Sequence, residues 1–410
     1  MARRPRERRS VAPVVGAVAG GAVLGAVAGG LAAGIHFSRR VLTPAKAPDA
    51  RVLVEEVLPP TEAGGLRRVR LRGPDAALTG SYSFIFDGGA SHARLGPVQE
   101  RAGDPAARGT GAERVVREIV AEDRGSLRAG AWGRITGWWY TSPAELDLGT
   151  ERVSIPLEGG HGWAWLVRPD PEAAQPGRWA VHVHGRGALP EETLRGLRPL
   201  ARAGVTSLVI AYRNDPGAPR GLHGRYGLGI SERRDVDAAI AWAREHGAAR
   251  VTLVGWSMGG TASMLAASRG PQHRMVDGVV LDSPALDWPG VLEQQARLAH
   301  APGWVGTLSC ALMQRGMIRG AVPGERRTDV ASLSPEGLLA GLRVPVLIHA
   351  SPEDTFVPWA GSLRAAELRP DIVTLREERG EHVKLWNVDP EGWETSTEAF
   401  VRGLPAPALN

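Results

Sequence analysis

The chain has 410 residues, 43% of them hydrophobic and 23% charged, which is enough to bury two cores and is typical of a globular protein. Its net charge of +5 comes from residues 1–46, which carry +7 and leave −2 for the rest, so no nucleic-acid partner is expected on a folded domain. The single cysteine, Cys310, excludes an intrachain disulfide and is expected to be a small buried hydrophobic residue.

The N-terminal 50 residues predict membrane attachment. Residues 1–10 are basic, and the run from Val11 to Ile35 holds 25 residues without a charge, enough to cross a bilayer. We expect a cytoplasmic tail over 1–10, a transmembrane signal anchor over 11–35 and a linker over 36–50. The membrane is then a partner, and the rest of the chain lies outside the cytoplasm. The dominance of glycine and alanine leaves open a cleaved signal peptide and a secreted protein.

Residues 51–145 predict a small β-rich domain, because short apolar runs alternate with Gly-Gly and Gly-Pro turns. The candidate strands are Arg51–Glu55, Arg67–Leu71, Tyr82–Phe86, Arg114–Ile119 and Trp132–Tyr140. The aromatic cluster Trp138, Trp139 and Tyr140 is expected in the core of this sheet, with a platform for a ligand as the alternative.

From residue 146 to 410, short apolar runs alternate with helical patterns. The runs are Trp179–His184, Ser207–Tyr212, Val251–Val254, Gly278–Leu281, Val344–His349 and Ile372–Leu375. Strands that are apolar along their whole length are buried on both faces, so this pattern predicts the α/β class with a parallel sheet. Helices are predicted at Arg233–His246 and Met258–Arg269. The long interval at about 285–342 predicts a helical cap over the strand ends.

One strand–turn–helix junction predicts a nucleophilic serine. The segment Val251–Gly260 contains Gly255-x-Ser257-x-Gly259 directly after an apolar strand and directly before a helix. Such a turn, the nucleophile elbow, needs small residues two positions before and after the serine so that strand and helix can approach. Gly255 and Gly259 meet this need, and Ser257 is the predicted nucleophile, held in a strained backbone with its hydroxyl above the sheet.

A serine hydroxyl needs a base to remove its proton, and the base needs an acid to orient it. His382 follows the last predicted strand, and Asp354 follows the strand before it. Because the carboxyl ends of parallel strands gather at one edge of a sheet, we predict a triad of Ser257, Asp354 and His382. Glu353 and Asp282 are the alternative acids.

The tetrahedral intermediate of acyl transfer needs two backbone N–H donors. One donor is expected from Met258, the residue after the nucleophile. The other is expected from the main chain of Arg186, in the loop His184-Gly185-Arg186-Gly187 after the first parallel strand. The Arg186 side chain is expected in solvent, with contact to an anionic substrate group as the alternative.

Together these segments resemble the α/β-hydrolase superfamily, and they are most similar to its bacterial prolyl-oligopeptidase-like and esterase-like branch with an N-terminal membrane segment. The segments are His-Gly-Arg-Gly at 184–187, Ala-Tyr-Arg-Asn-Asp at 211–215, Gly-Trp-Ser-Met-Gly-Gly at 255–260, Glu-Asp-Thr-Phe-Val-Pro at 353–358 and Glu-His at 381–382. The resemblance covers about residues 150–404. It implies an eight-stranded, mostly parallel sheet, a catalytic domain over 146–410, the same triad, and neither metal nor organic cofactor.

The expected function is a serine hydrolase that cleaves ester or amide and peptide bonds through an acyl-enzyme on Ser257. Its expected partner is a small-molecule or short-peptide acyl substrate. An acyltransferase would use the same triad. A different class is a non-catalytic, membrane-anchored binding protein whose β-rich domain engages cell-envelope material. Membership of a fold family does not decide among these functions or identify the substrate. The sequence also leaves the oligomeric state open.

Overall fold

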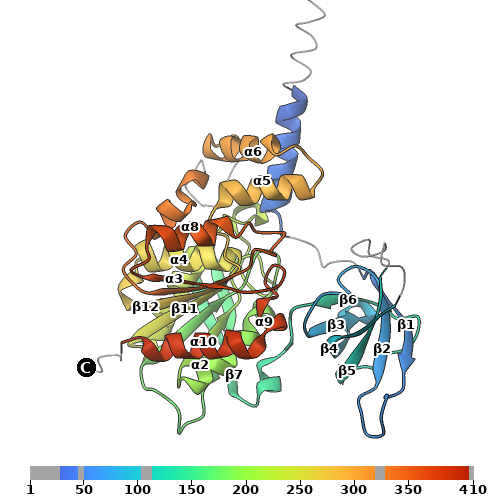
Figure 1. The fold of residues 1–410 in the computed structure, drawn as a ribbon. Helices are drawn as coiled ribbons and strands as arrows, with labels where there is room; N and C mark the ends of the chain where they lie inside the picture. The colour runs from blue at the N-terminus through green and yellow to red at the C-terminus, as the bar shows by residue number, and fades with distance from the viewer. Residues whose placement is uncertain (1–27, 45–49, 103–112, 319–327, 406–410) are drawn as a thin grey trace, which may run out of the picture.

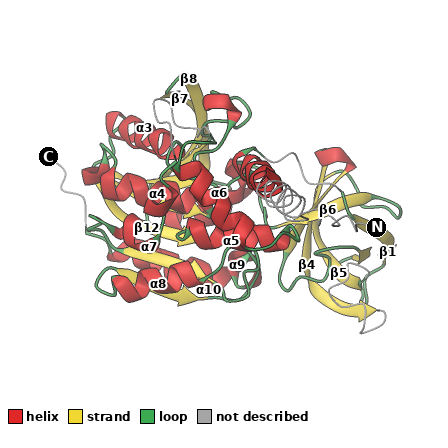
Figure 2. Cartoon of the chain, turned by 90° about the horizontal axis from the view of Figure 1, so that it is seen from above, coloured by secondary structure: helices red, strands yellow, loops and turns green. Residues whose placement is uncertain are grey.

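The computed structural model describes residues 28–44, 50–102, 113–318 and 328–405. These residues form a closed β-barrel, an α/β domain beside it, and a group of helices stacked on the α/β domain (Figure 1). Seen from above, helices flank the sheet of the α/β domain, while the barrel is built mostly of strands (Figure 2).

A helix over residues 28–42 packs onto the α/β domain. Phe37, Val41 and Leu42 are buried in the largest hydrophobic core, and the Leu42 carbonyl accepts a hydrogen bond from the Tyr226 N–H at 2.8 Å. The predicted linker over 36–50 is therefore wrong for residues 36–42. The reason is that these three apolar side chains lie on one face of a helix, and burial of that face stabilises the helix. An extended linker would leave the same side chains exposed to water.

The predicted transmembrane anchor over 11–35 falls only partly within the structure, since residues 11–27 lie outside the described residues. No helix formed by the described residues is both long enough and apolar enough to cross a bilayer. Near the end of the predicted span, Gly34 lies against Leu308 and Leu312 of α6 (Trp304–Gln314), and its carbonyl accepts a hydrogen bond from Ser309 at 3.1 Å. The last residues of this uncharged run thus contact protein.

Six strands close the barrel in the order β1-β2-β5-β4-β3-β6, with antiparallel neighbours throughout. The strands are β1 (Val52–Leu58), β2 (Arg68–Arg72), β3 (Tyr82–Phe86), β4 (Ser91–Ala102), β5 (Arg114–Arg124) and β6 (Trp132–Thr136). Alternate residues point inward, such as Val69 and Leu71 on β2, and fill a core of their own.

The predicted strand Trp132–Tyr140 is wrong in its second half, because β6 ends at Thr136. Trp139 and Tyr140 leave the barrel and pack against Trp386 of α9 (Leu385–Val388), with ring centroids 6.2 and 6.3 Å apart. These two rings belong to a core of the α/β domain, and the large apolar area that they bury there outweighs their preference for a strand.

A fully buried arginine holds one loop of the barrel. Arg117 on β5 has no exposed surface, and it donates hydrogen bonds to four backbone carbonyls. The acceptors are the carbonyls of Ala76 at 2.9 Å, Gly80 and Gly96 at 2.8 Å each, and Leu78. Burial lowers the pKa of Arg117 to about 10, so the guanidinium stays charged at neutral pH. Three of its four acceptors lie in the segment 76–80.

Replacing Arg117 by methionine is expected to lower the free energy of unfolding by about 3 kcal/mol, because four carbonyls would lose a charged donor. Urea unfolding followed by circular dichroism measures the change. Arg114→Met is the control, since Arg114 lies on the same strand but is exposed and pairs with Glu55. Its loss should stay within about 1 kcal/mol. Equal losses in the two variants would contradict the role given to Arg117.

The α/β domain contains an eight-stranded sheet in the order β14-β13-β12-β11-β9-β10-β8-β7. The strands are β7 (Gly149–Leu157), β8 (Gly160–Arg168), β9 (Arg178–Val183), β10 (Thr206–Ile210), β11 (Arg250–Trp256), β12 (Val276–Asp282), β13 (Val346–Ala350) and β14 (Val373–Glu377). β9 to β14 run parallel, and β8 is antiparallel to both of its neighbours. The predicted α/β class and mostly parallel sheet are confirmed.

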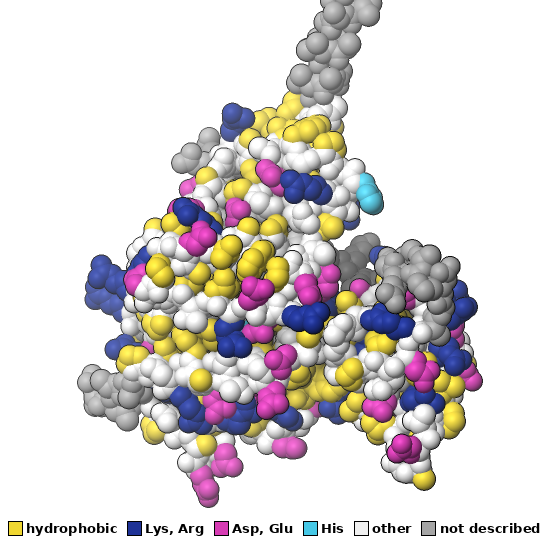
Figure 3. All heavy atoms as spheres, in the orientation of Figure 1, with side chains coloured by type: hydrophobic (Ala, Val, Ile, Leu, Met, Phe, Trp, Pro, Cys, Tyr) yellow, Lys and Arg dark blue, Asp and Glu magenta, His cyan; other side chains and the backbone are white. Residues whose placement is uncertain are grey.

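Helices cover both faces of this sheet (Figures 1 and 2). One face carries α3 (Glu232–Glu245), α4 (Met258–Arg269) and α8 (Ala360–Leu368), and the other carries α2 (Leu197–Arg202) and α10 (Pro390–Gly403). The interval predicted as a cap contains α5 (Trp288–Leu298), α6 and α7 (Pro335–Leu339). Exposed apolar side chains lie on these helices and just after them (Figure 3). They are Leu298, Trp304 and Met317.

Candidate active site

Ser257 lies at the junction of β11 and α4, in a backbone conformation that few residues adopt. Its φ and ψ are 50° and −117°, and α4 begins at the next residue, Met258. A positive φ is unfavourable for a residue with a Cβ, and it persists here because strand and helix fix both sides of the turn. The side chain is thereby held at the carboxyl end of the sheet, where Ser257 keeps 8% of its surface exposed.

The two glycines of the turn are required by close backbone contacts. A Cβ on Gly255 would lie 2.7 Å from the Gly259 carbonyl oxygen, and a Cβ on Gly259 would overlap the carbonyl oxygens of Val183 and His184. Gly255 therefore lets α4 approach β11, and Gly259 lets α4 approach the end of β9. These contacts are the physical reason for small residues on both sides of Ser257.

Hydrogen bonds connect the three predicted triad residues. Ser257 Oγ lies 3.0 Å from His382 Nε2, and His382 Nδ1 lies 2.8 Å from Asp354 Oδ2. The other carboxylate oxygen of Asp354 accepts the N–H groups of Phe356 and Val357 at 2.9 Å each, which fixes the carboxylate plane. The structure thus brings together side chains that lie 125 and 28 residues apart in the chain.

The two alternative acids lie elsewhere. Glu353 accepts the Gly380 N–H at 3.0 Å and pairs with Arg379 at 3.3 Å. Asp282 is fully buried and accepts a hydrogen bond from the Trp393 indole at 2.9 Å; burial raises its pKa. Neither carboxylate contacts His382 among the interactions of the described residues, so the geometry favours Asp354 as its partner.

Two backbone N–H groups beside Ser257 are available for an oxyanion. The N–H groups of Met258 and Arg186 donate to no acceptor within the part of the chain that the structure describes. The loop that carries Arg186 runs against the serine, since a Cβ on Gly185 would lie 3.0 Å from the Ser257 Cβ. Unpaired donors at this place match what a tetrahedral intermediate needs.

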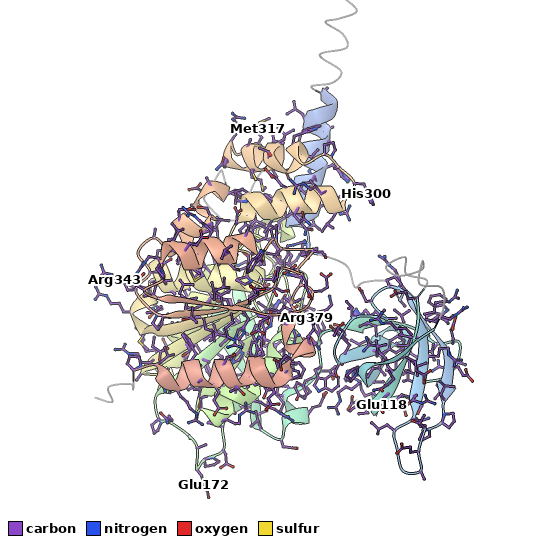
Figure 4. All side chains as sticks on the ribbon, in the orientation of Figure 1. Glu118, Glu172, His300, Met317, Arg343 and Arg379 are labelled. Atoms are coloured by element: carbon purple, nitrogen blue, oxygen red, sulfur yellow. The ribbon has the colours of Figure 1, made fainter. Side chains whose placement is uncertain are left out.

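A cavity of about 600 Å³ lies in front of Ser257, and both domains form its walls. The α/β domain contributes Ser257, His382 and the loop of Arg186. The barrel contributes Val52, Pro74, Asp75, Leu78, Arg134, Ile135 and Trp138, together with Arg51 just before β1. Trp138 lines the cavity, so its predicted place in the sheet core is wrong. The loop around Arg379, three residues before His382, lies on the side of the α/β domain that faces the barrel (Figure 4).

Residues 180–394, slightly more than half of the chain, match the model of the α/β-hydrolase family. The chain belongs to the α/β-hydrolase family. It is therefore a hydrolase enzyme, and its sheet is the α/β-hydrolase sheet that the sequence motifs predict. Residues 60–136 of this hydrolase, which make up most of the barrel, match a domain family of unknown function.

Solved structures similar to the hydrolase include the esterase Pf2001 of Pyrococcus furiosus, which is 17% identical and has a TM-score of 0.49. That match covers 65% of this chain and 96% of the esterase. An α/β hydrolase from Vibrio vulnificus is 17% identical over 62% of this chain and 81% of its own, with a TM-score of 0.46. An esterase domain from Rhodothermus marinus is 19% identical, and the match covers 62% of this chain and 99% of that domain, with a TM-score of 0.42. No curated protein matches the hydrolase.

A buried polar network supports the loop of Gly185 and Arg186, and sequence reasoning missed it. The His184 ring lies 2.8 Å from Asp215, donates to the Gly185 carbonyl at 2.9 Å and stacks on Tyr212 at 4.1 Å. Burial opposes protonation of His184, but Asp215 above all, then Glu192 and the Gly185 carbonyl, together outweigh burial, so the pKa of His184 is raised. The sequence does hold a signal for this network. The motifs at 184–187 and 211–215 directly follow β9 and β10, which are neighbouring parallel strands.

Asn387 in α9 connects the barrel of the hydrolase to the loop after β14. Its amide nitrogen donates to the barrel-side carbonyls of Ser81 at 2.8 Å and Gly137 at 3.2 Å. Its amide oxygen accepts from Arg195 at 2.6 Å, and Arg195 also donates to the carbonyl of Val383 at 2.9 Å. One buried network therefore holds the barrel wall of the cavity and the residue that follows His382.

Proposed function

We propose that this hydrolase cleaves an ester through an acyl-enzyme on Ser257. The observation that carries the proposal is the hydrogen-bonded series Ser257–His382–Asp354 at the edge of the cavity. A serine in an elbow turn, a base within reach of its hydroxyl and an acid that orients the base are the parts that nucleophilic catalysis requires.

The reaction begins when Ser257 Oγ attacks the ester carbonyl while His382 Nε2 takes the hydroxyl proton. Asp354 stabilises the resulting imidazolium through Nδ1, and the N–H groups of Met258 and Arg186 receive the oxyanion. His382 then gives its proton to the leaving alkoxide, which departs as an alcohol. Water, deprotonated by His382, hydrolyses the acyl-enzyme and restores the serine.

Labelling with a fluorophosphonate probe tests the nucleophile. Wild-type protein is expected to be labelled, and Ser257→Ala is expected to remain unlabelled, because the probe reacts only with an activated serine. Ser268→Ala, near the other end of α4, is the matched control and should be labelled like the wild type. Persistent labelling of Ser257→Ala would assign the nucleophile to another residue and refute the proposal.

A further inference from the structure

The cavity in front of Ser257 holds charged side chains from both domains. Its cations are Arg51, Arg134, Arg186 and Lys384, and its carboxylates are Asp75, Glu192 and Glu381. No ion pair joins any of these cations to a carboxylate among the residues that the structure describes. The lining therefore carries four positive and three negative charges, a net charge of +1, with its cations outside any ion pair of the described residues.

Two of the three carboxylates are already used by the fold. Glu192 is buried and accepts the Gly185 N–H at 2.7 Å. Glu381 accepts the N–H of Thr355 at 3.1 Å and its hydroxyl at 2.8 Å. The third, Asp75, is exposed, so water screens its charge. Among the described residues, none of the three carboxylates forms an ion pair with the cations on the cavity wall, so the cations remain available to a ligand.

Arg186 stands on the α/β side of the cavity, in the loop that runs against Ser257. Arg186 is half-buried, and the one hydrogen bond of its side chain among the described residues goes to the Val41 carbonyl at 3.2 Å. Burial lowers the pKa of Arg186; Tyr226 and Tyr212 act in the opposite direction, and the nearby cation Arg40 lowers it further. A guanidinium has five N–H donors, so most of those on Arg186 are free to bind a ligand.

Arg134 stands on the barrel side, on β6. Arg134 is half-buried, its guanidinium lies 6.0 Å from the centre of the Trp138 ring, and its side chain makes no hydrogen bond within the described parts of the chain. Burial lowers the pKa of Arg134 as well. An aromatic face offsets only part of the cost of taking a cation out of water.

Guanidinium groups that are partly withdrawn from water without an anion are unfavourable, and a bound anion would remove that cost. We propose that the ester substrate carries a second, anionic oxygen group, a carboxylate or phosphate, which binds to Arg134 and Arg186. The inference rests on the proposed function, since it places the ester carbonyl at Ser257. It also gives the barrel a role in substrate choice, because Arg134 comes from β6.

A pair of 4-nitrophenyl esters of nearly equal length tests this specificity. One is the hemiglutarate, which has a free carboxylate, and the other is the valerate, which has none. Arg134→Met is expected to lower kcat/KM for the hemiglutarate about 30-fold and to leave the valerate nearly unchanged, because only the first loses a charged hydrogen bond. Arg134→Lys should retain part of the preference. Arg128→Met, an exposed barrel arginine paired with Asp87, should leave both esters unaffected.

Binding measurements separate this inference from the proposed function. Calorimetric titration of the Ser257→Ala variant with glutarate, and in parallel with inorganic phosphate, requires no catalysis. The anion site is supported if either anion binds to Ser257→Ala and no longer binds to the double variant that also carries Arg134→Met. This result does not depend on whether Ser257 is the nucleophile. Absence of binding by both anions, or equal effects of Arg134→Met on the two esters, would overturn the inference.

Discussion

Replacing Ser257 or His382 by alanine is expected to lower kcat for ester hydrolysis about 10⁶-fold in each case, and the double variant should lose no more than either single one. The reason is the 3.0 Å contact between Ser257 Oγ and His382 Nε2. Without the imidazole the hydroxyl keeps its proton, and without the hydroxyl the imidazole has nothing to activate. Steady-state hydrolysis of a 4-nitrophenyl ester measures all three variants.

The non-additive result is what distinguishes a working pair from two separate contributions. Losses that multiplied in the double variant would mean that Ser257 and His382 act independently, against the proposed mechanism. The residual rate should still exceed the rate in water, because the N–H groups of Met258 and Arg186 remain in place. Ser268→Ala again serves as the control for a serine removed from α4.

The central sheet and the site at its edge could be predicted because both depend on local pattern. β9, β11, β12 and β13 are buried along nearly their whole length, and their sequences are correspondingly apolar. Ser257, Asp354 and His382 each follow such a strand or its neighbour β14. Since parallel strands end at one edge, residues far apart in the chain converge without any further information.

Strands with mixed exposure were missed for a physical reason. β4 contains Gly96-Pro97, a pair that predicts a turn, and the strand accommodates it through shifts in its register with β5. β7 lies at the edge of the large sheet, where most of its residues are exposed, so it has no apolar run. In both cases the pairing partner, rather than the strand's own sequence, determines the structure.

The barrel wall of the cavity also could not be predicted. Arg134 and Trp138 line the same cavity as Ser257 only because the barrel docks on the α/β domain, and that docking depends on contacts such as those of Asn387 with two barrel carbonyls. A single asparagine in a short helix gives no sequence signal of such a contact. The position of residues 36–42 on the core was hidden in the same way, since it depends on contacts with residues distant in the chain, such as Tyr226.

The strongest test of the assigned acid is Asp354→Asn, which is expected to lower kcat about 10⁴-fold with little loss of stability. The N–H groups of Phe356 and Val357 hold one oxygen of residue 354 and would keep the amide oxygen of an asparagine in that position. The amide NH2 would then face His382 Nδ1 and donate to it. This forces the ring proton onto Nε2, so the nitrogen beside Ser257 could no longer accept the serine proton.

Glu353→Gln is the matched control for this substitution, because it neutralises the neighbouring carboxylate, one of the two alternative acids. Glu353 is exposed and contacts Gly380 and Arg379, so its variant should keep nearly the full wild-type rate. Thermal unfolding of both variants shows whether the fold is retained. A large loss in Glu353→Gln with a small one in Asp354→Asn would transfer the orienting role to residue 353, which requires the loop after β13 to rearrange when substrate binds.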